Sequence, residues 1–420
     1  MSHPSRRQFL ASLGAAALIP SLPRPRFHSA SPTAARGVIV RTITAGVALE
    51  RLSDRVAVER ALAILARAKR RFEGEGYEVQ TTRITLPPRV ATLDVAGRRT
   101  ALDELRALDA MFTASGAMLG LGPVLLADRA DDELAPWTAE LVRSTKSTSF
   151  SSVIASPSGG VHSHGVRVAA AITRAVADAR PTGMGSFQHA AAANIPSGTP
   201  FFPVGWHEGA SSLAVGLQSV AVLREAFAGA PDREEARRRL TARLTTELRQ
   251  VERIGTAAAR TEGLRYAGID SSPAPLGDDS IGGAIEALTG APFGEAGTLQ
   301  ACALITDVIK SVPVALCGYS GLMLPVLEDK VLAARAREGR YGLRDLLLFS
   351  SVCGTGLDVI PLPGDTPQAT IERVILDVAA QAVKLKKALS VRLFLVPGKS
   401  VGDAVHFDDP RLFDTVVMRA

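Results

Sequence analysis

The sequence contains little cysteine. Its 420 residues include three cysteines, Cys302, Cys317 and Cys353. An odd number rules out complete intramolecular pairing, and so few exclude a scaffold held together by disulfides. The chain also has no Cys-x-x-Cys pair and no His-Glu-x-x-His motif, which removes two common zinc signatures.

Aromatic residues are scarce as well, at 5% of the chain, and no basic stripe is interleaved with them. The formal net charge is +6, but the first 36 residues hold five arginines and no acidic residue. The rest of the chain has 43 basic and 42 acidic residues, a net charge of +1. The high pI is therefore no evidence for nucleic-acid binding, and no nucleic-acid partner is expected.

Long uncharged apolar runs are missing too. The apolar run Leu10–Ile19 is too short to span a bilayer, which takes about 20 apolar residues. Arg6 and Arg7 precede it, and together they have the layout of a twin-arginine export signal. We therefore interpret residues 1–36 as a signal peptide recognised by the twin-arginine translocase. The mature protein is expected to be periplasmic or extracellular, with no stable membrane insertion.

Residues 37–420 are predicted to form a single large α/β domain. Stretches rich in β-branched residues alternate with stretches of helical apolar spacing, which indicates a mostly parallel sheet, open or closed into a barrel, with helices outside. Strands are predicted near residues 37–49, 77–86, 118–122, 148–155, 264–270, 357–361 and 390–396. Helices are predicted near residues 55–74, 102–115, 131–145, 164–179, 211–227, 232–259, 280–289, 297–311, 327–339, 341–351 and 367–387.

Ligands in such folds bind at the carboxyl ends of strands, so polar loops after strands are the candidate sites. One loop contains Ser158, Gly159 and Gly160 and leads into a helix beginning near His164. Its backbone N–H groups suit an anion, such as a substrate carboxylate. Capping by solvated histidines, or metal binding by His162 and His164, are the alternatives.

A second loop contains Trp206, His207 and Glu208. Aromatic rings beside titratable groups are typical of a pocket wall, although a histidine next to a carboxylate is also an ordinary polar pair. A third stretch ends a strand at Asp270, which has no predicted capping role and is therefore free for a ligand. Glu286 lies on the helix that follows, in an apolar run, and is either exposed or buried with a partner.

Cys353 precedes a glycine, which leaves its sulfur uncrowded. It is either an inert buried thiol, a thiol in a binding or catalytic site, or half of a disulfide. Near the C-terminus, Lys399, His406 and Asp408 line either a polar pocket or a solvated loop. The sequence "PGKS" lacks the upstream glycine of a phosphate-binding loop, so we reject a nucleotide site.

Several motifs together resemble domain-of-unknown-function family 711, in order along nearly the whole mature chain. They are "FFPVGWHEG", "DDSIGGAIEAL", "GYSGLMLPVLED", "SSVCGTGLDVIPLPGDT" and "VPGKSVGDAVHFDDPRLFDT". The resemblance implies a barrel similar to that of the pyruvate formate-lyase-like glycyl radical enzymes. It does not imply their chemistry, because the chain lacks the Arg-Val-x-Gly-aromatic motif, is shorter, and as an exported protein would meet oxygen.

Three functional hypotheses follow. The first is a small-molecule hydrolase or lyase, with Cys353 as nucleophile or substrate contact, His207 or His406 as general base, and Asp270 or Asp358 orienting it. Its ligand is a small molecule, with an anionic group held by the glycine loop. The second is a non-catalytic binding or scaffold protein, and the third a metal-dependent hydrolase. Cofactors and homo-oligomerisation stay open.

Overall fold

One large sheet organises the molecule, in the strand order β8-β7-β1-β2-β3-β4-β6-β10-β9, with β5 paired to β4. This computed structural model describes residues 37–420, so the predicted signal peptide lies outside the described residues. The sheet strands are β1 (Ile39–Gly46), β2 (Val79–Thr85), β3 (Met118–Leu125), β4 (Thr148–Ser156), β5 (Gly160–Val161), β6 (His189–Ala193), β7 (Ser212–Gln218), β8 (Arg265–Asp270), β9 (Gly356–Pro363) and β10 (Leu389–Val396).

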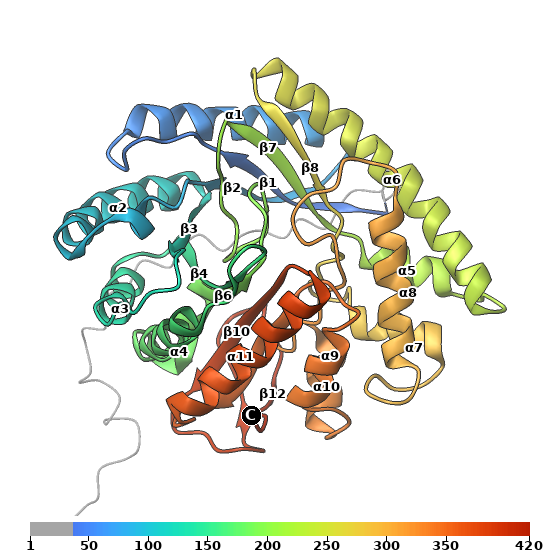
Figure 1. The fold of residues 1–420 in the computed structure, drawn as a ribbon. Helices are drawn as coiled ribbons and strands as arrows, with labels where there is room; N and C mark the ends of the chain where they lie inside the picture. The colour runs from blue at the N-terminus through green and yellow to red at the C-terminus, as the bar shows by residue number, and fades with distance from the viewer. Residues whose placement is uncertain (1–36) are drawn as a thin grey trace, which may run out of the picture. The chain divides into compact units, whose positions relative to one another are not determined.

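Helices cover the outer face of the curved sheet (Figure 1). They are α1 (Arg55–Gly74), α2 (Val95–Ser115), α3 (Leu134–Ser144), α4 (Ser163–Asp178), α5 (Val220–Phe227), α6 (Arg233–Thr261), α7 (Ile281–Thr289), α8 (Thr298–Ser311), α9 (Lys330–Arg337), α10 (Leu343–Phe349) and α11 (Gln368–Leu385). Two short 3-10 helices, η1 (Arg89–Thr92) and η2 (Pro181–Gln188), and a hairpin of β11 (Ala404–Val405) and β12 (Thr415–Val416) complete the list.

The strands fall into two parts by direction: a central parallel block forms one part, and the two flanking pairs, which run the opposite way, form the other. Strands β1, β2, β3, β4 and β6 are parallel to one another, as are β7 with β8 and β9 with β10. The parts meet in antiparallel pairings, β1 with β7 and β6 with β10. The predicted α/β class with a mostly parallel sheet is therefore confirmed. The carboxyl ends of the two parts point to opposite ends of the sheet.

The edge strands β8 and β9 are not paired with each other in the described chain, but the segment 315–326 contacts both. Leu316 forms a single parallel bridge with Ile269 of β8, and Pro325 forms one with Asp358 of β9. The segment thus joins the two ends of the strand ladder through isolated bridges.

Helix α1 shows how the sequence specifies the outer layer. The Asp54 side chain accepts a hydrogen bond from the Ala57 amide and caps the first turn, where free N–H groups need acceptors. The residues that face the sheet, including Leu65 and Phe72, are buried at helical spacing. The helix predicted near residues 55–74 is confirmed here, although Val56 in its first turn is exposed.

The prediction of one helix over residues 211–227 was wrong. The structure has strand β7 followed by the short helix α5. Every residue of β7 is buried between β1 and β8, so its apolar run carries no alternation that would reveal a strand. Strand β6 was also missed, because its four alanines favour a helix in isolation.

The inner face of the sheet, opposite the helices, is covered by the loop of residues 196–209. Phe201 and Val204 of this loop pack against Ala190 and Ala192 of β6, so small side chains on that strand make room for them. A Cβ at Gly120 of β3 would come within 2.9 Å of the Phe202 ring. The loop therefore fills the space that larger strand side chains would occupy.

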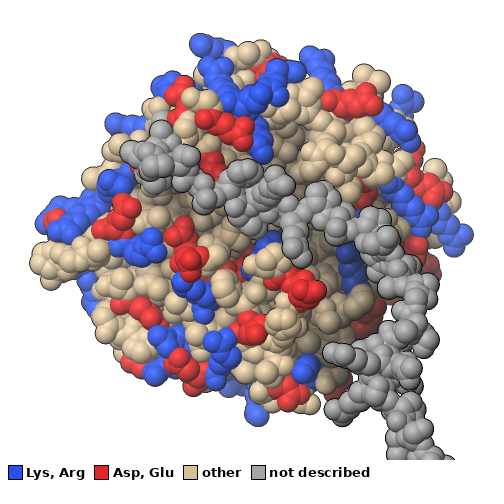
Figure 2. Space-filling view, turned by 180° about the vertical axis from the view of Figure 1, so that it is seen from behind, with Lys and Arg blue, Asp and Glu red and all other residues tan. Residues whose placement is uncertain are grey.

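The face of the molecule opposite to the view of Figure 1 carries both signs of charge. Figure 2 shows lysine and arginine interspersed with aspartate and glutamate over the rear of the molecule. In the described part of the chain, no helix combines the length and apolar character needed to cross a membrane.

Candidate functional site

Arg83 of β2 is a buried cation on the inner face. The residue is 7% exposed, and its Nη1 donates to the Pro200 carbonyl at 3.3 Å. Its guanidinium lies 4.8 Å from the centre of the Phe202 ring, a favourable cation–π contact. Its Nε has no hydrogen-bond partner among the described residues. Burial lowers the pKa of Arg83 to about 9, so the side chain still carries its charge at neutral pH.

Three further arginines act electrostatically on Arg83, namely Arg41 of β1, Arg392 of β10 and Arg411. We call these four residues the arginine cluster. Like charges in one region oppose one another, although Arg41 is only half-buried and Arg411 is exposed; burial is the largest effect lowering the pKa of Arg41. The fold thus brings positively charged side chains from distant parts of the sequence into one region.

The cluster has an unequal supply of carboxylates. Arg392 donates from Nε to Asp358 Oδ1 at 2.7 Å and from Nη2 to Glu328 Oε1 at 3.1 Å. Arg411 forms an ion pair with Asp409 at 2.6 Å, whereas Arg41 donates to the Gln80 amide oxygen. Arg83 has only a carbonyl and an aromatic ring.

Glu328 links the cluster, because its negative charge favours the charged form of all four arginines and opposes the lowering of pKa at Arg41 and Arg83. In the described chain, four guanidinium groups therefore share three carboxylates, those of Glu328, Asp358 and Asp409. Guanidinium groups suit carboxylates and phosphates, since their N–H donors match two acceptor oxygens. The arrangement fits an anionic ligand at Arg83.

Asp270, predicted to be free for a ligand, is fully engaged by the protein. Its carboxylate accepts hydrogen bonds from Ser272 N, Ser272 Oγ, Tyr319 N and Ser320 N, at 2.6 to 3.1 Å. Burial raises its pKa, and these hydrogen bonds oppose that rise. The carboxylate fixes the turn at Gly318, where φ is +63° and a Cβ would lie 2.1 Å from Asp270 Oδ2.

Cys353 lies in the large apolar core, fully buried. Its backbone carbonyl accepts a hydrogen bond from Lys387 Nζ. The next residue, Gly354, crosses Gly321 so closely that a Cβ on either would overlap the other's backbone. The glycine beside Cys353 is therefore required by a chain crossing.

The two histidines predicted as bases lie apart. His207 is buried beside Gly46 of β1, with Nε2 3.1 Å from the Gly209 carbonyl, and burial lowers its pKa. His406 is on the C-terminal hairpin, with its side chain 75% exposed and paired to Asp414 at 2.7 Å. The described residues show no hydrogen bond joining Cys353, His207, Asp270 or His406.

The glycine loop is a turn at the surface. Ser158 and Gly159 are exposed and Gly160 is half-buried. His162 is buried with Nε2 2.9 Å from Ser156 Oγ, whereas His164 is exposed with Nδ1 3.7 Å from Asp128. Within residues 37–420, no group of three or more His, Cys, Asp or Glu residues could hold a metal ion.

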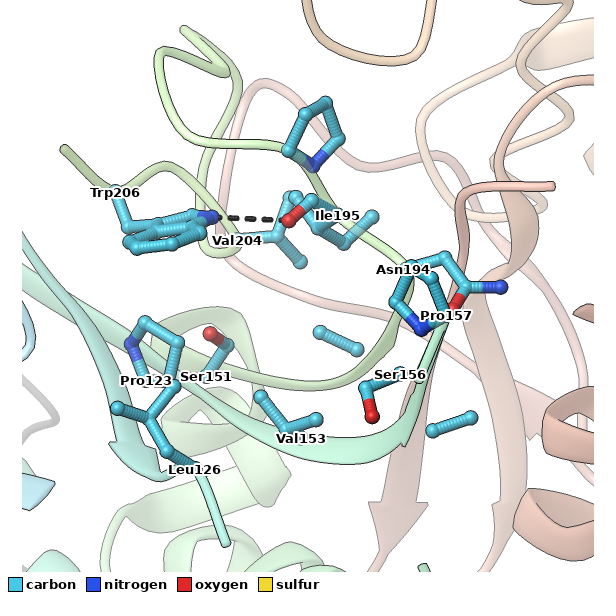
Figure 3. A pocket seen from close by; sticks show the side chains of 13 residues that line it. Pro123, Leu126, Ser151, Val153, Ser156, Pro157, Asn194, Ile195, Val204 and Trp206 are labelled. Atoms are coloured by element: carbon cyan, nitrogen blue, oxygen red, sulfur yellow. Dashed lines mark hydrogen bonds between the residues drawn. The ribbon is translucent and has the colours of Figure 1, made fainter. Parts of the chain in front are cut away.

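The other predicted residues divide between surface and structural roles. Glu208, Lys399 and Asp408 are exposed. Glu286 is half-buried and paired with Arg335 at 2.6 Å; its pKa, raised by burial, is lowered overall by hydrogen bonds from Arg335 and the Phe293 amide. Trp206 lines a pocket at the carboxyl ends of β3, β4 and β6 (Figure 3).

The arginine cluster was missed from the sequence, although a signal exists. Arg41, Arg83 and Arg392 each interrupt a strand of β-branched or apolar residues, in "IVRTIT", "TTRIT" and "SVRLF". A charge inside such a strand must either face solvent or find a buried partner. Asp358, predicted to orient a base, is the one predicted catalytic residue that contacts the cluster.

Comparison with known proteins identifies close similarity over most of the chain. The family model described as "Uncharacterised ACR (DUF711)" matches residues 34–408. A UPF0210 protein of Pyrobaculum islandicum is 32% identical over 362 residues, covering 82% of this chain and 79% of that protein. A UPF0210 protein of Desulforudis audaxviator is 30% identical over 399 residues, covering 88% of each chain.

Proposed function

The chain belongs to the DUF711 family, and we propose that this member is a small-molecule enzyme of the hydrolase or lyase class that binds its substrate through an anionic group at the arginine cluster. One observation carries the proposal: Arg83 is a buried cation to which no carboxylate of residues 37–420 is hydrogen-bonded. A buried charge is costly unless it is paired, so a site that retains one is suited to a ligand of opposite charge.

In this proposal, Arg83 binds the substrate and nearby carboxylates transfer protons. Arg83 anchors a carboxylate or phosphate of the substrate, and Phe202 keeps the guanidinium plane fixed. Glu328 and Asp358 are the carboxylates available for proton transfer, each held by Arg392. In this proposal Cys353 has no catalytic role, because its side chain is fully buried in the apolar core.

We also propose that the sheet closes into a barrel. The bridges made by the segment 315–326 support a barrel in which this segment closes the gap between β8 and β9. Two parallel parts joined in antiparallel fashion, with loops inserted on the inner face, are compatible with the expected likeness to the glycyl radical enzyme barrel. In such a barrel the arginine cluster would be enclosed.

We also propose export by the twin-arginine route. The support is the Arg6-Arg7 pair followed by the short apolar run. Replacing both arginines by lysine in the full chain should retain the precursor in the cytoplasm, as measured by fractionation. Unchanged export of this variant would contradict the assignment.

Calorimetric titration with succinate and inorganic phosphate tests the anion site. Succinamide, of similar size and uncharged, is the control ligand. We expect the wild-type chain to bind one of the anions, and Arg83→Met to weaken that binding at least tenfold. Arg67→Met is the matched control, because Arg67 is a surface arginine paired with Glu262. Equal binding by the Arg83 variant and the wild type would overturn the proposal.

Turnover requires a separate assay. Once an anion binds, esters, amides and hydroxy acids bearing the same charged group can be screened for product by mass spectrometry. Glu328→Gln should abolish product formation while anion binding is retained, since the amide keeps the side chain's shape. Binding without turnover of any compound would favour the non-catalytic binding protein.

A further inference from the structure

A pocket of about 330 Å³ opens at the carboxyl ends of β3, β4 and β6. Its walls come from these strands and from the loop 196–209, which contributes Val204 and Trp206 (Figure 3). The volume is at the lower end of the range for small-molecule sites.

The walls are mostly apolar. Pro123, Val153 and Val204 surround the space, and the Trp206 indole forms one flat side (Figure 3). The indole Nε1 donates to the Ile195 carbonyl at 3.0 Å, which satisfies its polar atom and fixes the ring. A flat, fixed aromatic wall suits a planar apolar group.

Two polar atoms of the pocket have no partner among the described residues, Ser151 Oγ and Asn194 Oδ1. Asn194 has a defined orientation, since its Nδ2 donates to the carbonyls of Ala382 and Lys387 at 3.1 and 3.0 Å. Its oxygen is therefore an acceptor awaiting a donor. A buried polar atom without a partner costs about 1–3 kcal/mol, so a ligand that satisfies it gains affinity.

We propose that this pocket binds a small, planar, largely apolar molecule carrying a hydrogen-bond donor, such as an amide N–H or a hydroxyl. The donor pairs with Asn194 Oδ1, an atom that can only accept, and the apolar part stacks on Trp206. This second site does not depend on the anion site. The loop 196–209 separates the two, with Pro200 and Phe202 facing Arg83 and Val204 and Trp206 facing the pocket.

Fluorescence can report on the pocket directly. The chain has two tryptophans, so Trp137→Phe leaves Trp206 as the only one. Titration with benzamide should change the Trp206 emission. Acetophenone, of similar size but without a donor, should bind roughly fivefold more weakly, as expected for one hydrogen bond of about 1 kcal/mol. Calorimetry on the wild-type chain gives a second readout if the Trp137 variant folds poorly.

A substitution that fills the pocket completes the test. Val153→Phe should abolish benzamide binding and leave succinate binding at Arg83 unchanged. Leu376→Phe adds an aromatic ring on the exposed face of α11 and is the control, with benzamide binding expected at the wild-type level. Equal affinity for the two compounds, or benzamide binding that survives Val153→Phe, would overturn the proposal. Because succinate binding is measured on the same variants, failure of the anion site would be recognised separately.

Discussion

Asp270 and Arg83 are both buried charged residues, yet the fold treats them in opposite ways. Asp270 accepts four hydrogen bonds, two of them from the backbone of the turn that it fixes. Arg83 donates one to a carbonyl, leaves Nε without a partner, and has cations for neighbours. The Asp270 carboxylate is fully hydrogen-bonded within the fold, whereas the Nε–H of Arg83 has no acceptor among the described residues. Both side chains are buried, so burial does not distinguish a residue that stabilises the fold from one that binds a ligand. Their hydrogen bonds make that distinction.

The largest effect should come from removing the satisfied charge. Asp270→Ala leaves the backbone amides of Tyr319 and Ser320 buried without acceptors. At about 1–3 kcal/mol for each of the two donors, we expect a loss of roughly 2–6 kcal/mol in the free energy of unfolding. Urea denaturation measures this. A loss below about 1 kcal/mol would mean that the carboxylate is not the support of this turn.

His189 is a buried titratable residue that is uncharged in the native state at neutral pH. Burial lowers the pKa of His189 from its ordinary value of 6.5 to about 3, and its Nε2 lies 3.0 Å from Ser152 Oγ. The unfolded chain takes up a proton below about pH 6.5 and the native state does not, so stability falls as pH drops from 6.5 toward 3. Over this range we expect a loss on the order of a few kcal/mol.

Urea denaturation at pH 7, 5 and 4 measures that dependence, with His189→Gln as the comparison. The glutamine has no titrating group, so its variant should lose less stability over the same range. Parallel curves for the two proteins would show that His189 does not contribute to the pH dependence.

Removing the unsatisfied charge should have the opposite sign from Asp270→Ala. Arg83→Met replaces a buried, unpaired cation by an apolar side chain of similar length. We expect the ligand-free protein to become more stable, by about 1–4 kcal/mol, as it loses affinity for anions. Thermal unfolding with and without succinate measures both effects. A marked destabilisation of the ligand-free variant would mean that Arg83 serves the fold.

The smallest effect is expected at Cys353. Its side chain belongs to the apolar layer, so Cys353→Ala should cost about 1 kcal/mol through lost packing and leave anion binding within twofold of wild type. Alkylation should be slow in the native state and fast after unfolding, as followed by mass spectrometry. Rapid alkylation of the native protein would restore Cys353 as a candidate nucleophile.

Most elements could be predicted because their periodicity is local. Helix α1 has its cap and stripe within one stretch of sequence, and β10 is a continuous apolar run with one charge. Strands β6 and β7 could not be recognised, because their partners lie far away in sequence. The alanines of β6 are explained only by Phe201 and Val204, which pack against them from the loop.

The candidate site was harder to predict for the same reason. Loops that follow strands were the predicted ligand sites, and one of these loops contains Trp206, which does line a pocket. Arg41, Arg83 and Arg392 were not predicted as site residues, because they lie within strands and come into one region only when the sheet curves. A carboxylate such as Asp270 gives no sign in the sequence of whether other segments will supply its donors.

The sequence by itself determined the α/β class, most of the helices and strands, and membership of a family with shared motifs along nearly all of residues 37–420. These depend on side-chain periodicity, capping and motif order, which are properties of neighbouring residues. Only the tertiary structure decided which buried charges are satisfied, that Cys353 lies in the apolar core, and that four arginines share one region. Burial and pairing arise between distant residues, so their energies exist only once the chain has folded.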